Sequence, residues 1–169
     1  MDLPGATYLF GLAGLSISFV GFSSIAIAFL KATENEMSEE AFEIIRVFLT
    51  NGIIAAAFSL LPLLMRLLGL SFDPVWRLSS ALLAIVGLIS LATRIRLRLR
   101  VKSWPVPLRI LVNWTINVLV SVLLGLNAAG VFFDPYVGPY AAGVTWQAAI
   151  APIIFAENLS LFFRRRSKA

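Results

Sequence analysis

Long runs of apolar residues, separated by short polar stretches, dominate the sequence. A helix of about 20 apolar residues spans the hydrocarbon core of a bilayer. We therefore expect an all-α integral membrane protein, a bundle of about five transmembrane helices that occupies residues 1–169 as a single transmembrane domain. The runs predict these helices at about residues 7–30, 39–68, 74–94, 108–129 and 139–163.

Two of the polar stretches carry signals for the start of a helix. Ser38 can cap a helix whose first turn holds Glu39 and Glu40, because acidic groups suit the positive end of the helix dipole. Asp73 followed by Pro74 indicates an N-cap and a first helical residue. These signals predict where the second and third helices begin.

Lys and Arg residues gather at one set of helix ends. Of the 14, six lie between Arg94 and Arg109 and four lie in the C-terminal tail. Both segments are expected on the cytoplasmic side, where membrane proteins carry an excess of these residues. Counting the spans back from them predicts an N-out/C-in orientation. Aromatic residues that favour the interface fall near the predicted outer side: Tyr8, Trp76, Tyr136 and Tyr140.

Charged and apolar residues alternate between Arg94 and Lys102. A period of two suits a strand better than a helix, whereas cations around a helix end would snorkel to lipid phosphates. Both structures are compatible with the pattern, and in either one the cations are expected to contact anionic headgroups on the cytoplasmic side. The predicted lipid-contact residues are Arg94, Arg96, Arg98, Arg100, Lys102, Arg164, Arg165 and Arg166.

Composition narrows the chemistry further. Hydrophobic residues make up 59% of the chain and charged residues 14%, far from the balance of soluble domains. The absence of Cys and His removes thiolate chemistry, imidazole acid/base catalysis and the usual zinc sites. We expect no enzyme activity, no metal and no cofactor. The net charge is +5, and the cationic residues flank the apolar spans. This position indicates contact with lipid headgroups and not nucleic-acid binding.

Stripes of small residues run along three of the predicted helices. In lipid, small side chains let two helix backbones approach closely, so we interpret the stripes as helix-packing faces; the alternative is a pore or substrate cleft. The first helix carries Gly11, Gly14, Ser18 and Gly21, and the third carries Ser80, Ala84 and Gly87. The fifth carries Gly138, Ala142, Thr145, Ala149, Pro152 and Ala156.

The fourth predicted helix carries a polar face. At about 100° per residue, Asn113, Asn117, Ser121 and Asn127 fall within one arc of about 120°. A lipid-facing stripe of this kind is costly, so the face must meet other helices, a symmetry mate or water. The two interpretations are hydrogen bonding between helices and a hydrated path.

Glu157 is an acidic residue well inside an apolar run, about 10 Å inward from Arg164 by helical rise. Arg46 enters the second helix from the same side at a similar depth and is the preferred partner, ahead of Arg109 and Asn113. A Glu157–Arg46 ion pair would lock two helices together. The functional alternative is a protonatable or cation-binding site in a transport path, because ionisable groups inside membranes mark such paths.

Several short segments resemble a group of small uncharacterised bacterial multi-pass inner-membrane proteins. These segments are residues 18–23 (Ser-Phe-Val-Gly-Phe-Ser), 75–80 (Val-Trp-Arg-Leu-Ser-Ser), 138–140 (Gly-Pro-Tyr) and 145–146 (Thr-Trp). The resemblance implies a multi-pass protein of the bacterial inner (cytoplasmic) membrane. It implies no activity.

Three classes of function remain. We favour a homo-oligomeric channel or small transporter that uses Glu157 and the polar face of the fourth helix, because a short chain encloses a conduit more easily around a symmetry axis. The second class is a non-catalytic accessory or interaction subunit that docks another membrane protein. The third is an intramembrane enzyme acting on a lipid or quinone, for which a nucleophile and base are hard to assemble. The expected partners are the lipid bilayer and either further copies of the chain or another membrane protein.

Overall fold

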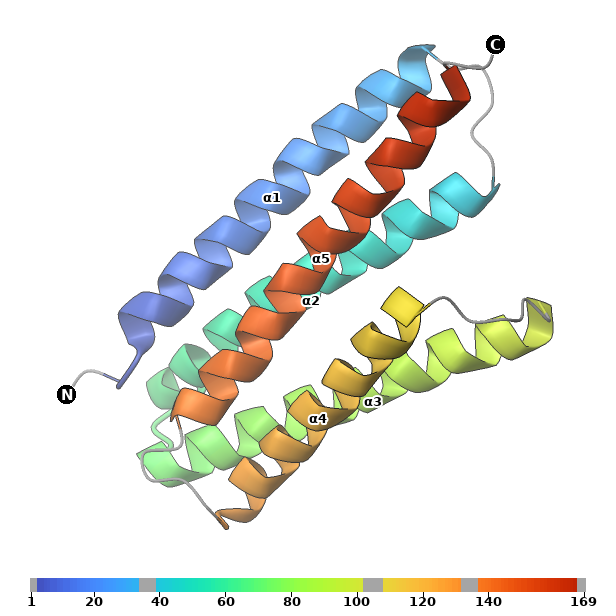
Figure 1. Ribbon diagram of the computed structural model, residues 1–169. Coiled ribbons are helices and arrows are strands. Elements are labelled where there is room, and N and C mark those ends of the chain that lie inside the picture. Colours follow the sequence, from blue (N-terminus) through green and yellow to red (C-terminus); the bar gives the residue numbers. More distant parts are fainter. Residues whose placement is uncertain (1–2, 34–38, 102–107, 132–136, 167–169) are drawn as a thin grey trace. The chain divides into compact units, whose positions relative to one another are not determined.

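Five helices form the part of the chain that the computed structural model describes, which is residues 3–33, 39–101, 108–131 and 137–166 (Figure 1). No strand occurs among these residues. The helices are α1 (Ala6–Thr33), α2 (Glu39–Leu67), α3 (Phe72–Val101), α4 (Leu108–Ala129) and α5 (Val137–Arg166). The all-helical prediction and the number of helices are therefore confirmed.

Both ends of α3 differ from the sequence-based expectation. The helix begins at Phe72, and the Val75 amide donates to the Ser71 carbonyl at 3.3 Å. Asp73 thus lies in the first turn and is not the residue before the helix. At the other end, α3 continues to Val101, so the alternating stretch from Arg94 is helical where the structure describes it, and the extended alternative is wrong there.

The helices are apolar on surfaces that the protein does not bury. Within the described residues, four stretches are long and apolar enough to cross a membrane: Ala6–Ile25, Phe48–Leu67, Phe72–Arg96 and Ile110–Ala129. The buried share of their most apolar windows is 28%, 39%, 33% and 22%, so most of this surface faces outward. Such surface is stable against lipid and not against water. These four helices therefore indicate a multi-pass membrane protein, and the span along α5 stays a prediction.

The chain divides into two compact units, which are described separately. Unit 1 comprises Met1–Gly5 and Leu61–Gly143, and unit 2 comprises Ala6–Leu60 and Val144–Ala169. Unit 1 therefore contains α3, α4 and the adjoining ends of α2 and α5. Unit 2 contains α1 and the longer parts of α2 and α5.

In unit 1, α3 and α4 run antiparallel along each other (Figure 1). Asn127 bonds to Ser80, and one turn away the Arg77 guanidinium lies against Gly130. The two pairs are each three residues apart on α3 and on α4, so together they fix the register of the two helices. The cationic side chain of Arg77 also lies at the C-terminus of α4, where the helix dipole favours positive charge.

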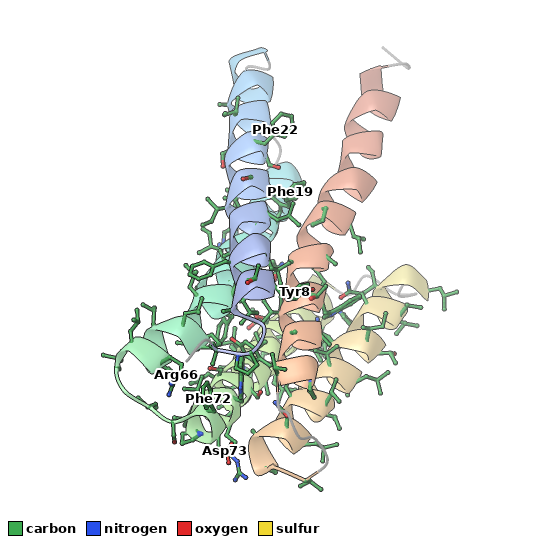
Figure 2. All side chains as sticks on the ribbon, turned by 90° about the vertical axis from the view of Figure 1, so that its left-hand side faces the viewer. Tyr8, Phe19, Phe22, Arg66, Phe72 and Asp73 are labelled. Atoms are coloured by element: carbon green, nitrogen blue, oxygen red, sulfur yellow. The ribbon has the colours of Figure 1, made fainter. Side chains whose placement is uncertain are left out.

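Two helix ends in unit 1 form the same capped turn. Gly69 and Gly130, with φ angles of 88° and 72°, follow α2 and α4. In each turn the glycine amide donates to the carbonyl three residues back, and the next amide donates to the carbonyl five residues back. This is the Schellman motif, in which glycine tolerates the left-handed conformation. After α2, Arg66 also donates to the Leu70 carbonyl at 2.5 Å and lies 4.1 Å from the centre of the Phe72 ring (Figure 2).

The beginning of α5 packs in unit 1 through aromatic residues. The rings of Trp76 and Tyr140 lie 5.6 Å apart, and both side chains are almost fully buried. Tyr140 is also hydrogen-bonded to Ser79. Trp76 and Tyr140 therefore contribute to helix packing, whereas the sequence suggested rings that settle at the membrane interface; Tyr136 lies outside the described residues.

In unit 2, α1 and α2 run antiparallel. The rings of Phe19 and Phe48 meet edge to face at 5.1 Å, and a Cβ atom added to Gly52 would overlap the side chain of Val20. The later part of α5 runs in the same direction as α1 (Figure 1). Tyr8 reaches from α1 toward α5 and hydrogen-bonds to Thr145 at 2.5 Å between hydroxyl oxygens (Figure 2).

The contact at Gly52 yields a test of unit 2. Gly52→Ala is expected to destabilise the protein by about 1–3 kcal/mol, because the new methyl group pushes α1 away from α2. The matched control is Gly125→Ala, where a Cβ meets nothing within 4 Å and alanine favours the helix by about 1 kcal/mol. Thermal unfolding in detergent measures both; equal midpoints for the two variants would contradict the α1–α2 packing.

Candidate functional site

Most of the polar face that the sequence placed on α4 is buried. Asn117, Ser121 and Asn127 are 5%, 6% and 0% exposed, and Asn113 is half-buried. Because α4 belongs to unit 1, these side chains lie on the helix that packs along α3. Three of the four side chains of this face are therefore buried within the chain.

The surface of α3 that meets this face is made of small residues. Asn127 Nδ2 donates to the Ser80 hydroxyl at 2.8 Å, and both residues are fully buried. With the register fixed by this bond, Ser121 falls opposite Val86 and within one residue of Gly87, which is buried. The small-residue stripe of α3 and the polar stripe of α4 therefore belong to one helix pair, which supports the hydrogen-bonding interpretation of the α4 face.

Other polar atoms of unit 1 are also used in packing. The Ser79 hydroxyl lies 3.5 Å from the Met65 sulfur, besides its bond to Tyr140. A Cβ atom on Gly143 would lie 2.9 Å from the side chain of Leu124, which brings the start of α5 close to α4. Within unit 1, polar and small side chains thus connect neighbouring helices.

The charged candidates are only partly described. Arg94 is half-buried, and Arg46 and Arg96 are exposed. The backbone of Glu157 is helical within α5, but its side chain lies outside the description, so the Glu157–Arg46 pair stays a prediction. The same holds for the predicted lipid contacts of the side chains of Arg98, Arg100, Lys102, Arg164, Arg165 and Arg166.

Unit 2 contains buried polar residues that the sequence analysis did not single out. Ser59 donates to the Ala55 carbonyl of its own helix at 2.8 Å. The hydroxyls of Ser16 and Ser23 and the indole N–H of Trp146 have no hydrogen-bond partner in the part of the chain that the structure describes. The buried polar residues described in unit 2 are Ser16, Ser23, Asn51, Ser59 and Gln147. A signal existed, because Ser16 and Ser23 stand seven residues apart in an apolar run and so share a helix face.

The small-residue stripe of α1 lies on the opposite side of that helix. Gly11, Gly14, Ser18 and Gly21 are exposed, and no atom lies within 4 Å of a Cβ position on any of the three glycines. We call this surface, together with its exposed flanking residues, the outer α1 face. The flanking residues are Phe10, Leu15, Ile17, Phe22 and Ile25. The predicted packing role of the stripe is thus not fulfilled among the described residues of this chain.

Comparison of the chain with protein families, with characterised proteins and with solved structures finds no match. Any functional conclusion therefore depends on the residues themselves.

The α3–α4 contact gives a direct test of the polar face. In a double-mutant cycle of Asn127→Ala and Ser80→Ala, we expect a coupling free energy of about 0.6 to 2 kcal/mol, the range of hydrogen bonds between membrane helices. Unfolding of the four proteins in detergent measures the coupling. Strictly additive losses would show that the two side chains do not interact.

Proposed function

We propose that the protein is a membrane assembly subunit that self-associates through the outer α1 face. The observation that carries this proposal is the open space over Gly11, Gly14 and Gly21 on an exposed helix face. Exposed large side chains on both sides of the stripe, such as Leu15 and Ile17, form ridges around it. A second helix would place its own ridges beside these and its backbone against the glycines.

The spacing of the stripe defines the geometry of this contact. Gly11, Gly14, Ser18 and Gly21 are separated by three, four and three residues, which is a heptad pattern. A repeat of 3.5 residues produces a left-handed crossing of about 20°, the commonest arrangement of membrane helices. Without a hydrophobic driving force in lipid, the close backbone approach at glycine supplies the dispersion energy of association.

A second copy of the chain suits this face as the partner. The apolar run from Thr7 to Leu30 contains no charged residue, so a parallel symmetric pair brings no like charges together. In such a pair, each Ser18 hydroxyl faces its counterpart near the symmetry axis and can exchange a hydrogen bond with it. The same surface on both subunits is what a two-fold interface requires.

Assembly through α1 is compatible with both favoured classes of function. A channel needs several copies around an axis, and an accessory subunit needs a docking helix. The buried α4 face favours the accessory class, because Asn117 and Ser121 are turned into the chain and do not line its outer surface. No catalytic step is part of the proposal.

The proposed setting is the bacterial inner membrane with the N-terminus outside and the C-terminus inside. The basic residues that end α3 and α5 and begin α4 support this orientation, because they would lie against anionic cytoplasmic headgroups. On the opposite side lie the two capped glycine turns.

Self-association is tested by disulfide cross-linking, for which the chain offers no competing cysteine. Oxidation of Ser18→Cys in membranes is expected to give a covalent dimer, because the Cα atoms across a close pair fall within the 4.4–6.8 Å that a disulfide bridges. The matched control is Ser16→Cys, which is buried on the other side of α1 and should stay monomeric.

Additional substitution of Gly14→Leu should abolish the Ser18→Cys dimer by filling the open space. A monomer from Ser18→Cys under all oxidising conditions would refute association with a second copy and leave a different membrane protein as the partner.

Orientation is tested with two leucines replaced by cysteine. Leu68 precedes the turn after α2 and Leu99 lies near the end of α3, and both are exposed. A membrane-impermeant maleimide is expected to label Leu68→Cys in intact cells and Leu99→Cys only after permeabilisation. The reverse pattern would invert the orientation.

A further inference from the structure

Among the described residues of unit 2, three buried polar atoms have no hydrogen-bond partner: Ser16 Oγ, Ser23 Oγ and Trp146 Nε1. Other hydroxyls on these helices are satisfied locally, since Ser24 and Ser59 each donate to the carbonyl four residues back at 2.8 Å. An unpaired buried donor or acceptor costs about 1–3 kcal/mol, so such groups call for a partner.

The two unpaired hydroxyls face α2. Ser16, Phe19, Val20 and Ser23 follow the i, i+3, i+4, i+7 spacing of one helix face. Phe19 contacts Phe48, and Val20 occupies the space over Gly52 of α2. Ser16 and Ser23 therefore lie above and below this contact, on the side of α1 opposite the outer α1 face.

The three atoms lie at successive heights. Trp146 follows Thr145, which is bonded to Tyr8, so Trp146 lies near the Tyr8 end of α1. By helical rise, Ser16 and Ser23 lie about 12 Å and about 22 Å further along α1 than Tyr8. A spread of this size covers most of the roughly 30 Å hydrocarbon core.

Buried amide side chains, Asn51 and Gln147, lie at two of these three heights. The Cβ position of Gly52 is 4.0 Å from the Ser16 carbonyl oxygen, so Asn51 lies at the height of Ser16. Gln147, which is 5% exposed, adjoins Trp146. The heights of Ser16 and Trp146 thus each have two polar groups, the number that a buried water needs at minimum.

The chemistry of these groups selects the occupant. The indole N–H of Trp146 only donates, so its partner must accept, and a serine hydroxyl both donates and accepts. The buried side chains described in unit 2 carry no charge, which disfavours an ion. Water is the small neutral molecule that meets these requirements.

We propose that the interior of unit 2 between α1, α2 and α5 holds bound water that partners Ser16, Ser23 and Trp146 and forms a hydrated path along the membrane normal. The backbone of Glu157 lies eleven residues after Trp146 on α5, about 16 Å further along, which is between the heights of Ser16 and Ser23. The path brings water to the height of this residue. It does not depend on self-association through the outer α1 face.

Cysteine accessibility tests the proposal in proteoliposomes. A small water-soluble methanethiosulfonate reagent reacts with thiolates, which form only where water reaches the sulfur. We expect Ser16→Cys and Ser23→Cys to react at least about tenfold faster than Leu124→Cys, a buried apolar position of α4 in unit 1. Equally slow reaction of all three variants would overturn the proposal.

Removal of the Ser16 and Ser23 hydroxyls provides a second test, because the thermal midpoint changes in opposite directions for a hydrated and a dry interior. With water bound, Ser16→Ala and Ser23→Ala leave it one partner short, and the thermal midpoint falls relative to Ser24→Ala, an exposed control that is bonded within its own helix. In a dry interior the same changes delete an unpaired polar group and the midpoint rises. A rise in both variants would also overturn the proposal.

Discussion

The absence of hydrogen-bonding solvent in the bilayer core is the constraint on which the structure depends. Each polar side chain inside the membrane must find a partner in the protein, a bound molecule or a second chain. In unit 1, some polar side chains meet this requirement with protein groups: the Asn127 amide nitrogen bonds to Ser80, and Tyr140 bonds to Ser79. Unit 2 leaves Ser16 and Ser23 without such partners. These hydroxyls, together with the indole N–H of Trp146, are the reason for placing water in unit 2.

Small residues act differently on the two sides of α1. Toward α2, the side chain of Val20 fills the space over Gly52, so α1 and α2 pack directly against each other there. Away from α2, the glycines of the outer α1 face meet nothing within 4 Å. One glycine-containing surface is thus filled inside the chain, and the other is the surface proposed to meet a second copy. A single helix can therefore link the packing of a subunit to the assembly of several.

Sequence reasoning predicted the helices well because a lipid environment leaves the backbone few alternatives. It also found the polar face of α4, since periodicity alone reveals a face. It could not identify Ser80 as the partner of Asn127, because register between helices is a tertiary property. The alternation of charged and apolar residues after Arg94 was ambiguous, because a period of two describes only the side chains. The backbone hydrogen bonds of a helix form whatever the order of these side chains, and α3 continues through this stretch. Ser16 and Ser23 were missed because serine in an apolar run also reads as a small packing residue.

The most direct test of a two-sided α1 is a scan of single spin labels from Leu12 to Ile25 in proteoliposomes, with oxygen and a water-soluble nickel chelate as relaxation agents. The account predicts nickel accessibility that peaks at positions 16 and 23. It also predicts protection from both agents at position 18, and high oxygen accessibility at the flanking position 15. Uniform oxygen accessibility over the outer α1 face, with no nickel accessibility at 16 and 23, would contradict it.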